Sequence, residues 1–130
     1  MIRKATISDL NRIDLTARSE VEALGFVPRV VIQQAILQEW LNYHEESGSF
    51  VLFRERKDGV TTVQYICVPF RYRGKGIGKA LIASLSRPIM LKCPAFIESN
   101  DFYRAMGFKH QGFEQNKKRP VNIWRLDDDE

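Results

Sequence analysis

The chain has 130 residues, of which 44% are hydrophobic. This length and composition predict one globular domain with a single core at 1–126, followed by an acidic tail at 127–130. No apolar run approaches the roughly 18 residues of a membrane span, and the opening MIRKATISDL lacks a signal-peptide core, so we expect a soluble, cytoplasmic protein without a membrane partner. The net charge is +4, and because the tail DDDE carries four of the 16 acids, residues 1–126 hold 20 bases against 12 acids, a balance that favours an anionic partner.

The first third of the chain predicts a strand and two helices. Residues 2–6 form a short β-type stretch, and Ser8 can cap a following helix whose apolar side is spaced as Leu10, Ile13 and Ala17. LGFVP at 24–28 interrupts this helix. Pro28 suits the first turn of a second helix, whose apolar positions are Val31, Ile32, Ala35 and Ile36.

The rest of the chain predicts a mixed sheet. Residues 39–68 contain the turn signals Ser47-Gly48 and Asp58-Gly59, which indicate three antiparallel strands. A helix after Gly78 and a strand at 89–93 follow, and this strand–helix–strand order predicts that the two flanking strands are parallel. A short helix closed by Gly107 and strands at 109–114 and 121–126 complete an α/β fold with helices on both faces of the sheet.

Two cysteines lie inside apolar runs. Cys67 and Cys93 have neither the spacing of a zinc site nor that of a disulfide framework, so we expect buried, reduced thiols and no metal.

The segment RGKGIG at 73–78 joins a predicted strand to a predicted helix. Its glycines allow backbone amides to approach a bulky ligand, and the helix start adds unpaired N–H donors. The residues fit neither a Walker loop, since Lys75 is followed by Gly76, nor a dinucleotide fingerprint, since a third glycine is missing. An ordinary strand-to-helix turn is the alternative to a phosphate site.

Arg73-x-x-Gly76-x-Gly78 resembles the R/Q-x-x-G-x-G/A signature of the GNAT superfamily of N-acetyltransferases. The segment SNDFYRAMGF at 99–108 is similar to the family's N-x-F-Y-x-x-x-G-F segment, and MIRKATISDL looks like its usual opening. The likeness covers essentially the whole chain. It implies the GNAT fold, with a mixed central sheet that is splayed at the cofactor site, and the transfer of an acetyl group from acetyl-CoA to an amine acceptor.

The resemblance also implies where the cofactor lies. The pantetheine arm would pair with the backbone of Ile66, Cys67 and Val68. The pyrophosphate would sit on the loop amides, and the flanking bases would add charge or remain solvated. These loop positions are Arg73, Gly74, Lys75, Gly76, Ile77, Gly78 and Lys79.

Acetyl transfer needs a deprotonated amine and a proton for the departing thiolate. Tyr103 matches the family's general-acid tyrosine, with a core aromatic as the alternative, and Asn100 is expected to contact pantetheine or a water unless it only caps its helix. Where some family members carry an acidic or histidine base, this chain has Gln64 and Thr62, neither of which can accept a proton at neutral pH. We therefore expect a water relay held by Thr62, Gln64 or backbone carbonyls, or an acceptor whose amine arrives neutral.

Other residues are weaker candidates for the chemistry. Glu98 is a fallback base, whereas His44 and His110 are expected to be surface or turn residues. Phe96 replaces a frequent family asparagine and suggests a more apolar wall. Aromatic residues that could line the acceptor site, or else belong to the core, are Phe26, Trp40, Tyr43 and Phe113.

Three functions remain open at this stage. An acetyltransferase is favoured over a non-catalytic acyl-CoA sensor, which the missing acid on the strand before the loop would suggest. A nucleic-acid modifier is the least favoured of the three, because the basic cluster Lys117, Lys118 and Arg119 has no interleaved aromatic residues. Family members often dimerise, so a homodimer is an open prediction.

Overall fold

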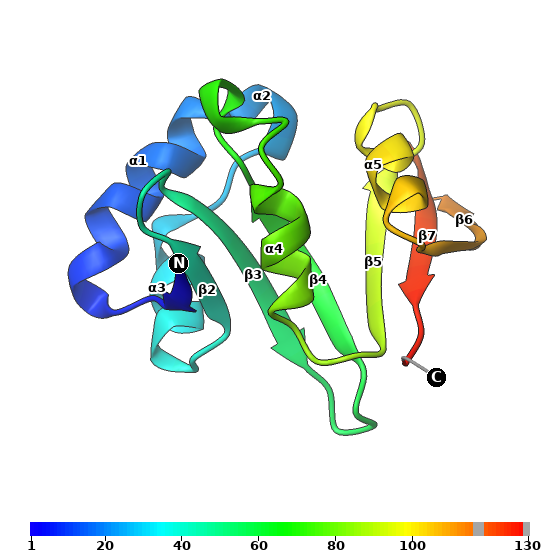
Figure 1. The fold of residues 1–130 in the computed structure, drawn as a ribbon, viewed down its shortest axis with the longest axis horizontal. Coiled ribbons are helices and arrows are strands. Elements are labelled where there is room, and N and C mark those ends of the chain that lie inside the picture. The colour runs from blue at the N-terminus through cyan, green and yellow to red at the C-terminus, as the bar shows by residue number, and fades with distance from the viewer. Residues whose placement is uncertain (116–118, 129–130) are drawn as a thin grey trace. The chain divides into compact units, whose positions relative to one another are not determined.

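The computed structural model describes residues 1–115 and 119–128 and contains a seven-stranded sheet in the order β1-β2-β3-β4-β5-β7-β6 (Figure 1). The strands are β1 (Ile2–Lys4), β2 (Leu41–His44), β3 (Ser49–Glu55), β4 (Thr61–Cys67), β5 (Ile89–Pro94), β6 (Lys109–Gln115) and β7 (Pro120–Leu126). The α-helices are α1 (Leu10–Ser19), α2 (Val21–Leu24), α3 (Arg29–Leu37), α4 (Ile77–Ala83) and α5 (Ser99–Ala105), and the 3-10 helices are η1 (Ile7–Asp9) and η2 (Phe70–Tyr72).

The chain divides into two compact units. Unit 1 comprises Met1–Arg54 and Gln64–Leu85, and unit 2 comprises Glu55–Val63 and Ser86–Glu130. β4 contributes residues to both. The predicted single domain at 1–126 and the predicted splay of the sheet stay predictions.

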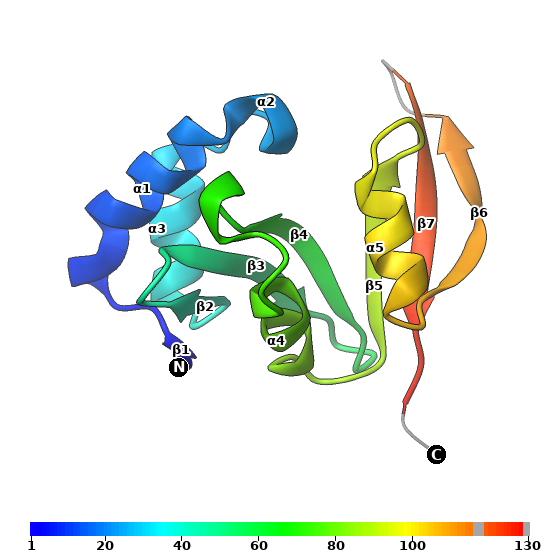
Figure 2. The ribbon, with the colours of Figure 1, turned by 45° about the horizontal axis from the view of Figure 1, so that its top comes forward.

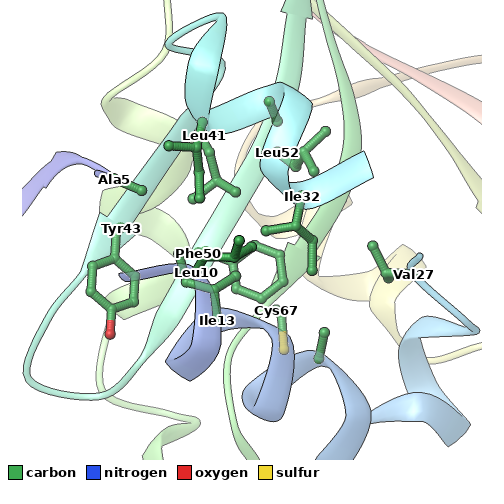
Figure 3. Close-up of a cluster of buried hydrophobic side chains, with 13 residues drawn as sticks. Ala5, Leu10, Ile13, Val27, Ile32, Leu41, Tyr43, Phe50, Leu52 and Cys67 are labelled. Atoms are coloured by element: carbon green, nitrogen blue, oxygen red, sulfur yellow. The ribbon is translucent and has the colours of Figure 1, made fainter. Parts of the chain in front are cut away.

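Unit 1 has helices on both faces of its strands, as the sequence predicts (Figure 2). Alternation along β2 places Leu41 and Tyr43 in a buried cluster with α1, α3 and β3, whereas Asn42 points to the other face and donates to Ser84 Oγ at the end of α4 (2.9 Å). Figure 3 shows this cluster, in which side chains such as Ile13 and Ile32 are fully buried against the sheet.

The first helix begins differently from the prediction. The chain enters α1 through the 3-10 turn η1, whose N-cap is Thr6, and the N-cap of α1 itself is Asp9, not Ser8. Asp9 stabilises this turn, because its carboxylate accepts a hydrogen bond from the backbone N–H of Thr6 (2.8 Å) and forms an ion pair with Arg3 (2.8 Å). The short helix α2 was also absent from the expected elements.

Unit 2 is built around β5. β5 pairs in parallel with β4 over Thr61–Val63 and antiparallel with β7 along its whole length, which confirms the predicted crossover. β6 is the edge strand, with a bulge between His110 and Gly112. α5 follows β5, and Gly107 comes directly after its C-cap Met106, with a φ of 97° that is the left-handed conformation expected of a residue after a helix.

Both cysteines are buried free thiols, as predicted. Burial raises the pKa of the Cys67 thiol to about 12 and that of Cys93 to about 11, so both stay protonated at neutral pH. Among the described residues, no helix has the length and apolar character required to cross a bilayer.

Candidate functional site

The loop between β4 and α4 is held in shape by glycine conformations. Gly74 and Gly76 have φ values of 78° and 83°, a region in which residues with a Cβ are strained. A Cβ built on either residue would meet no atom within 4 Å, so the backbone at both positions is open to an approaching ligand.

The start of α4 offers amides without helical acceptors. The first helical bond runs from Ala80 N–H to Gly76 O (3.0 Å), so the N–H groups of Ile77, Gly78 and Lys79 precede the ladder. Lys75 and Lys79 are exposed beside them. This arrangement of donors and positive charge suits an anion such as a pyrophosphate.

Arg73 is occupied within unit 1. Its Nε donates to Val68 O (3.0 Å), its Nη2 donates to Glu20 Oε1 (3.3 Å), and its guanidinium lies over the Phe70 ring (5.6 Å to the centroid). The expected contribution of Arg73 to phosphate binding therefore competes with contacts that shape the loop.

The side chains of the strand leading into the loop differ in their burial. Cys67 points into the unit 1 cluster, while Ile66 and Val68 are half-buried. Gln64 is exposed and lines a mostly apolar pocket of about 230 Å³ together with residues of α3 and with Trp40. Thr62 is half-buried in unit 2.

Tyr103 lies on α5, and its side chain is almost fully enclosed. It is 6% exposed and packs edge-on against the rings of Phe102 (5.3 Å) and Phe108 (5.6 Å). Burial raises the pKa of the Tyr103 phenol above its ordinary value, with a smaller contribution from Cys93. The hydroxyl therefore keeps its proton at neutral pH.

Asn100, three residues earlier on α5, has no hydrogen-bonding capacity left. Its Oδ1 accepts from Trp124 Nε1 (2.9 Å) and Asn122 Nδ2 (3.0 Å), and its Nδ2 donates to the carbonyls of Pro94 (2.9 Å) and Ile97 (2.8 Å). Both lone pairs and both N–H groups are used. We therefore do not propose the expected cofactor contact for Asn100, whose bonds tie α5 to β5 and β7.

Asn100→Ala should lower the free energy of unfolding by about 2–4 kcal/mol, because the Trp124 N–H would remain buried without an acceptor. Urea denaturation measures this loss. Gln111→Ala is the control, since Gln111 is exposed and makes one long bond, of 3.4 Å, to Lys109 O. A loss below about 1 kcal/mol for Asn100→Ala would contradict the structural role.

The fallback bases have structural partners or exposed positions. His44 Nδ1 bonds Ser47 Oγ in the β2–β3 turn (2.7 Å), and His110 Nε2 bonds Asn122 Oδ1 (2.8 Å). Glu98 is exposed at the N-cap of α5.

The aromatic candidates for an acceptor wall divide into three groups. Tyr43 belongs to the core at 1% exposure, and Trp40 lines the pocket beside Gln64. Phe26 and Phe113 are both more than 70% exposed, as is Phe96 at the position of the family's asparagine. In the basic cluster, Arg119 is exposed, whereas Lys117 and Lys118 lie outside the described residues.

The sequence reasoning missed Glu20. This residue lies between α1 and α2, and its Oε1 accepts the backbone N–H of Phe70 (2.7 Å) as well as the guanidinium of Arg73. Its distance of 50 residues from Phe70 in the chain gave no signal for the contact.

A mixed sheet with a glycine loop between β4 and the helix of a parallel crossover defines an α/β protein. Residues 34–110, more than half of the chain, match the model of the acetyltransferase (GNAT) domain. The chain belongs to the GNAT acetyltransferase family, as the sequence motifs indicated.

Solved structures share the fold at low sequence identity. A GNAT-family acetyltransferase from Bacillus cereus is 19% identical, with a TM-score of 0.81 and coverage of 98% of this chain and 96% of that one. The ribosomal-protein-S18-alanine N-acetyltransferase of Escherichia coli is 16% identical, with a TM-score of 0.76 and coverage of 97% and 92%. Naa50 of Arabidopsis thaliana, in complex with the bisubstrate analogue CoA-Ac-MVNAL, is 18% identical, with a TM-score of 0.73 and coverage of 97% of both chains. No curated protein matches the sequence at a significant level.

Proposed function

We propose that this chain is an acetyl-CoA-dependent N-acetyltransferase that modifies a primary amine of a small molecule, protein or peptide. The observation that carries the proposal is the open glycine loop of a GNAT-family chain, with three amides at the start of α4 that lack helical acceptors. When bound, acetyl-CoA supplies the acetyl group as a thioester, whose C–S bond breaks as the new N–C bond forms.

Main-chain groups bind acetyl-CoA, whereas Tyr103 and water transfer the protons. The amides of Gly74 to Lys79 hold the pyrophosphate, and the main chain of Ile66, Cys67 and Val68 pairs with the pantetheine arm. Tyr103 donates to the departing thiolate. The proton of the amine leaves through water held by Thr62, by Gln64 or by backbone carbonyls, or is lost before the amine binds, because neither side chain can accept it.

The raised pKa of Tyr103 sets an energetic cost for this role. Protonating a thiolate with a pKa of ~8.5 from a phenol with a pKa above ~10 is uphill by at least about 2 kcal/mol.

Turnover with labelled acetyl-CoA against a panel of amines, scored by mass spectrometry, tests the proposal. Acetylation of any amine, with release of free CoA, supports the enzyme. Tight binding of acetyl-CoA without turnover on any amine would favour the second candidate, a non-catalytic acyl-CoA sensor, for which the missing acid at Thr62 and Gln64 is the motivating observation.

Ionic strength should weaken the binding of acetyl-CoA. Exposed charges are screened over ~10 Å at 0.1 M salt and ~3 Å at 1 M, so contacts of Lys75 and Lys79 with phosphate should weaken and the Kd should rise. Calorimetry across this range measures the slope. The double variant Lys75→Gln, Lys79→Gln should lose most of it, whereas the exposed Lys57→Gln should keep it. A Kd that stays flat in the wild type would leave binding to the backbone amides alone.

A further inference from the structure

Glu20 joins the α1–α2 segment to the turn that opens the glycine loop. Its carboxylate accepts two donors from that turn, the Phe70 N–H at 2.7 Å and Arg73 Nη2 at 3.3 Å. The side chain is 17% exposed, so water competes weakly for these bonds. All of these groups belong to unit 1.

The backbone of Glu20 is fixed from both sides. Its N–H donates to Ala17 O (3.3 Å) as the C-cap of α1, and its carbonyl accepts Leu24 N–H (2.9 Å) as the first bond of α2. The carboxylate therefore extends from a rigid junction rather than from a free loop.

The turn that Glu20 holds determines the course of the chain into the loop. Tyr72 N–H donates to Pro69 O (2.8 Å), and Arg73 N–H donates to Phe70 O (3.2 Å), which closes η2 immediately before Gly74. Arg73 returns from this turn to Val68 O (3.0 Å), so the guanidinium bridges the end of β4 and Glu20.

We propose that Glu20 is a positioning residue for acetyl-CoA binding, acting through Phe70 and Arg73 to set the loop amides before the cofactor arrives. This inference rests on the proposed function. The hydrogen bonds, rather than the negative charge, carry the effect, because the charge itself opposes an incoming phosphate while the bonds order the turn.

Two substitutions separate the bonds from the charge. Glu20→Ala removes the acceptor, and we expect the Kd for acetyl-CoA to rise on the order of tenfold, with a matching rise in KM and a kcat close to the wild-type value. Glu20→Gln keeps an acceptor oxygen and removes the charge, so its Kd should stay within about threefold of wild type. Glu22→Ala is the matched control, since Glu22 is an exposed acid on α2.

Amide exchange in the ligand-free protein provides a readout that does not depend on the function. The Phe70 amide should exchange at least about tenfold faster in Glu20→Ala than in the wild type, with Glu20→Gln and Glu22→Ala close to the wild type. Melting curves of each variant establish that the comparison is between folded proteins.

The outcomes are distinct. Unchanged Phe70 exchange in Glu20→Ala would overturn the role of Glu20 in ordering the turn, and faster exchange with unchanged Kd would overturn its role in cofactor binding. An equal loss of affinity in Glu20→Gln and Glu20→Ala would assign the effect to charge and overturn the proposal as stated. If the wild type fails to bind acetyl-CoA, the proposed function fails and the positioning role with it, a result that no variant is needed to recognise.

Discussion

Tyr103→Phe should lower kcat by roughly 10²-fold or more, the usual scale for losing a positioned general acid. The substitution keeps the ring that packs between Phe102 and Phe108 and removes only the hydroxyl. The loss should appear in kcat and leave the KM for acetyl-CoA and the melting temperature nearly unchanged. Steady-state kinetics with an amine identified from the panel measures it.

The raised pKa of Tyr103 adds a pH criterion. The group is active in its protonated form, and its folded-state pKa lies above the ordinary value of ~10, so its loss of activity should begin only above that pH. If the kcat of the wild type falls as the pH rises and this fall begins below about pH 9, the deprotonation of another group is responsible. Full kcat in Tyr103→Phe would show that water protonates the thiolate.

Gly78→Val should raise the Kd for acetyl-CoA at least about tenfold, because a branched Cβ would obstruct amides that contact the phosphates. Gly78 lies in the first turn of α4, where valine can adopt the backbone conformation, so strain does not explain a loss there. Gly78→Ala is the control. The family signature admits alanine at this position, and its Kd should remain near the wild-type value.

Gly76→Val should produce a similar loss of affinity together with a loss of stability. Its φ of 83° is left-handed, which costs a residue with a Cβ about 1–2 kcal/mol. Gly59→Val in the β3–β4 turn is matched for this strain, with a φ of 89° and open space around the Cβ, and should lose stability without losing affinity. Calorimetry on folded Gly78→Val and Gly76→Val with unchanged Kd would contradict the pyrophosphate site.

The sequence by itself determined most of the elements and the family, although not α2 or the 3-10 turns. Helical spacing placed the buried residues of α1 and α3, turn pairs bounded β2, β3 and β4, and the order of strand, helix and strand implied the parallel pair β4 and β5. These inferences succeed because periodicity and turn conformation are properties of neighbouring residues. The loop motif could be recognised for the same reason, since the left-handed residues Gly74 and Gly76 directly precede the helix in the sequence.

Only the tertiary structure decided which distant groups meet. The sheet order places β7 between β5 and β6, and this pairing brings Trp124 to Asn100. Asn100, an expected cofactor ligand, therefore uses its hydrogen-bonding groups within the protein. Glu20 reaches Phe70 across 50 residues in the same way. A side-chain amide or carboxylate has the same local appearance whether it binds a ligand or a distant backbone group, and its hydrogen-bonding capacity is assigned only when the chain has packed.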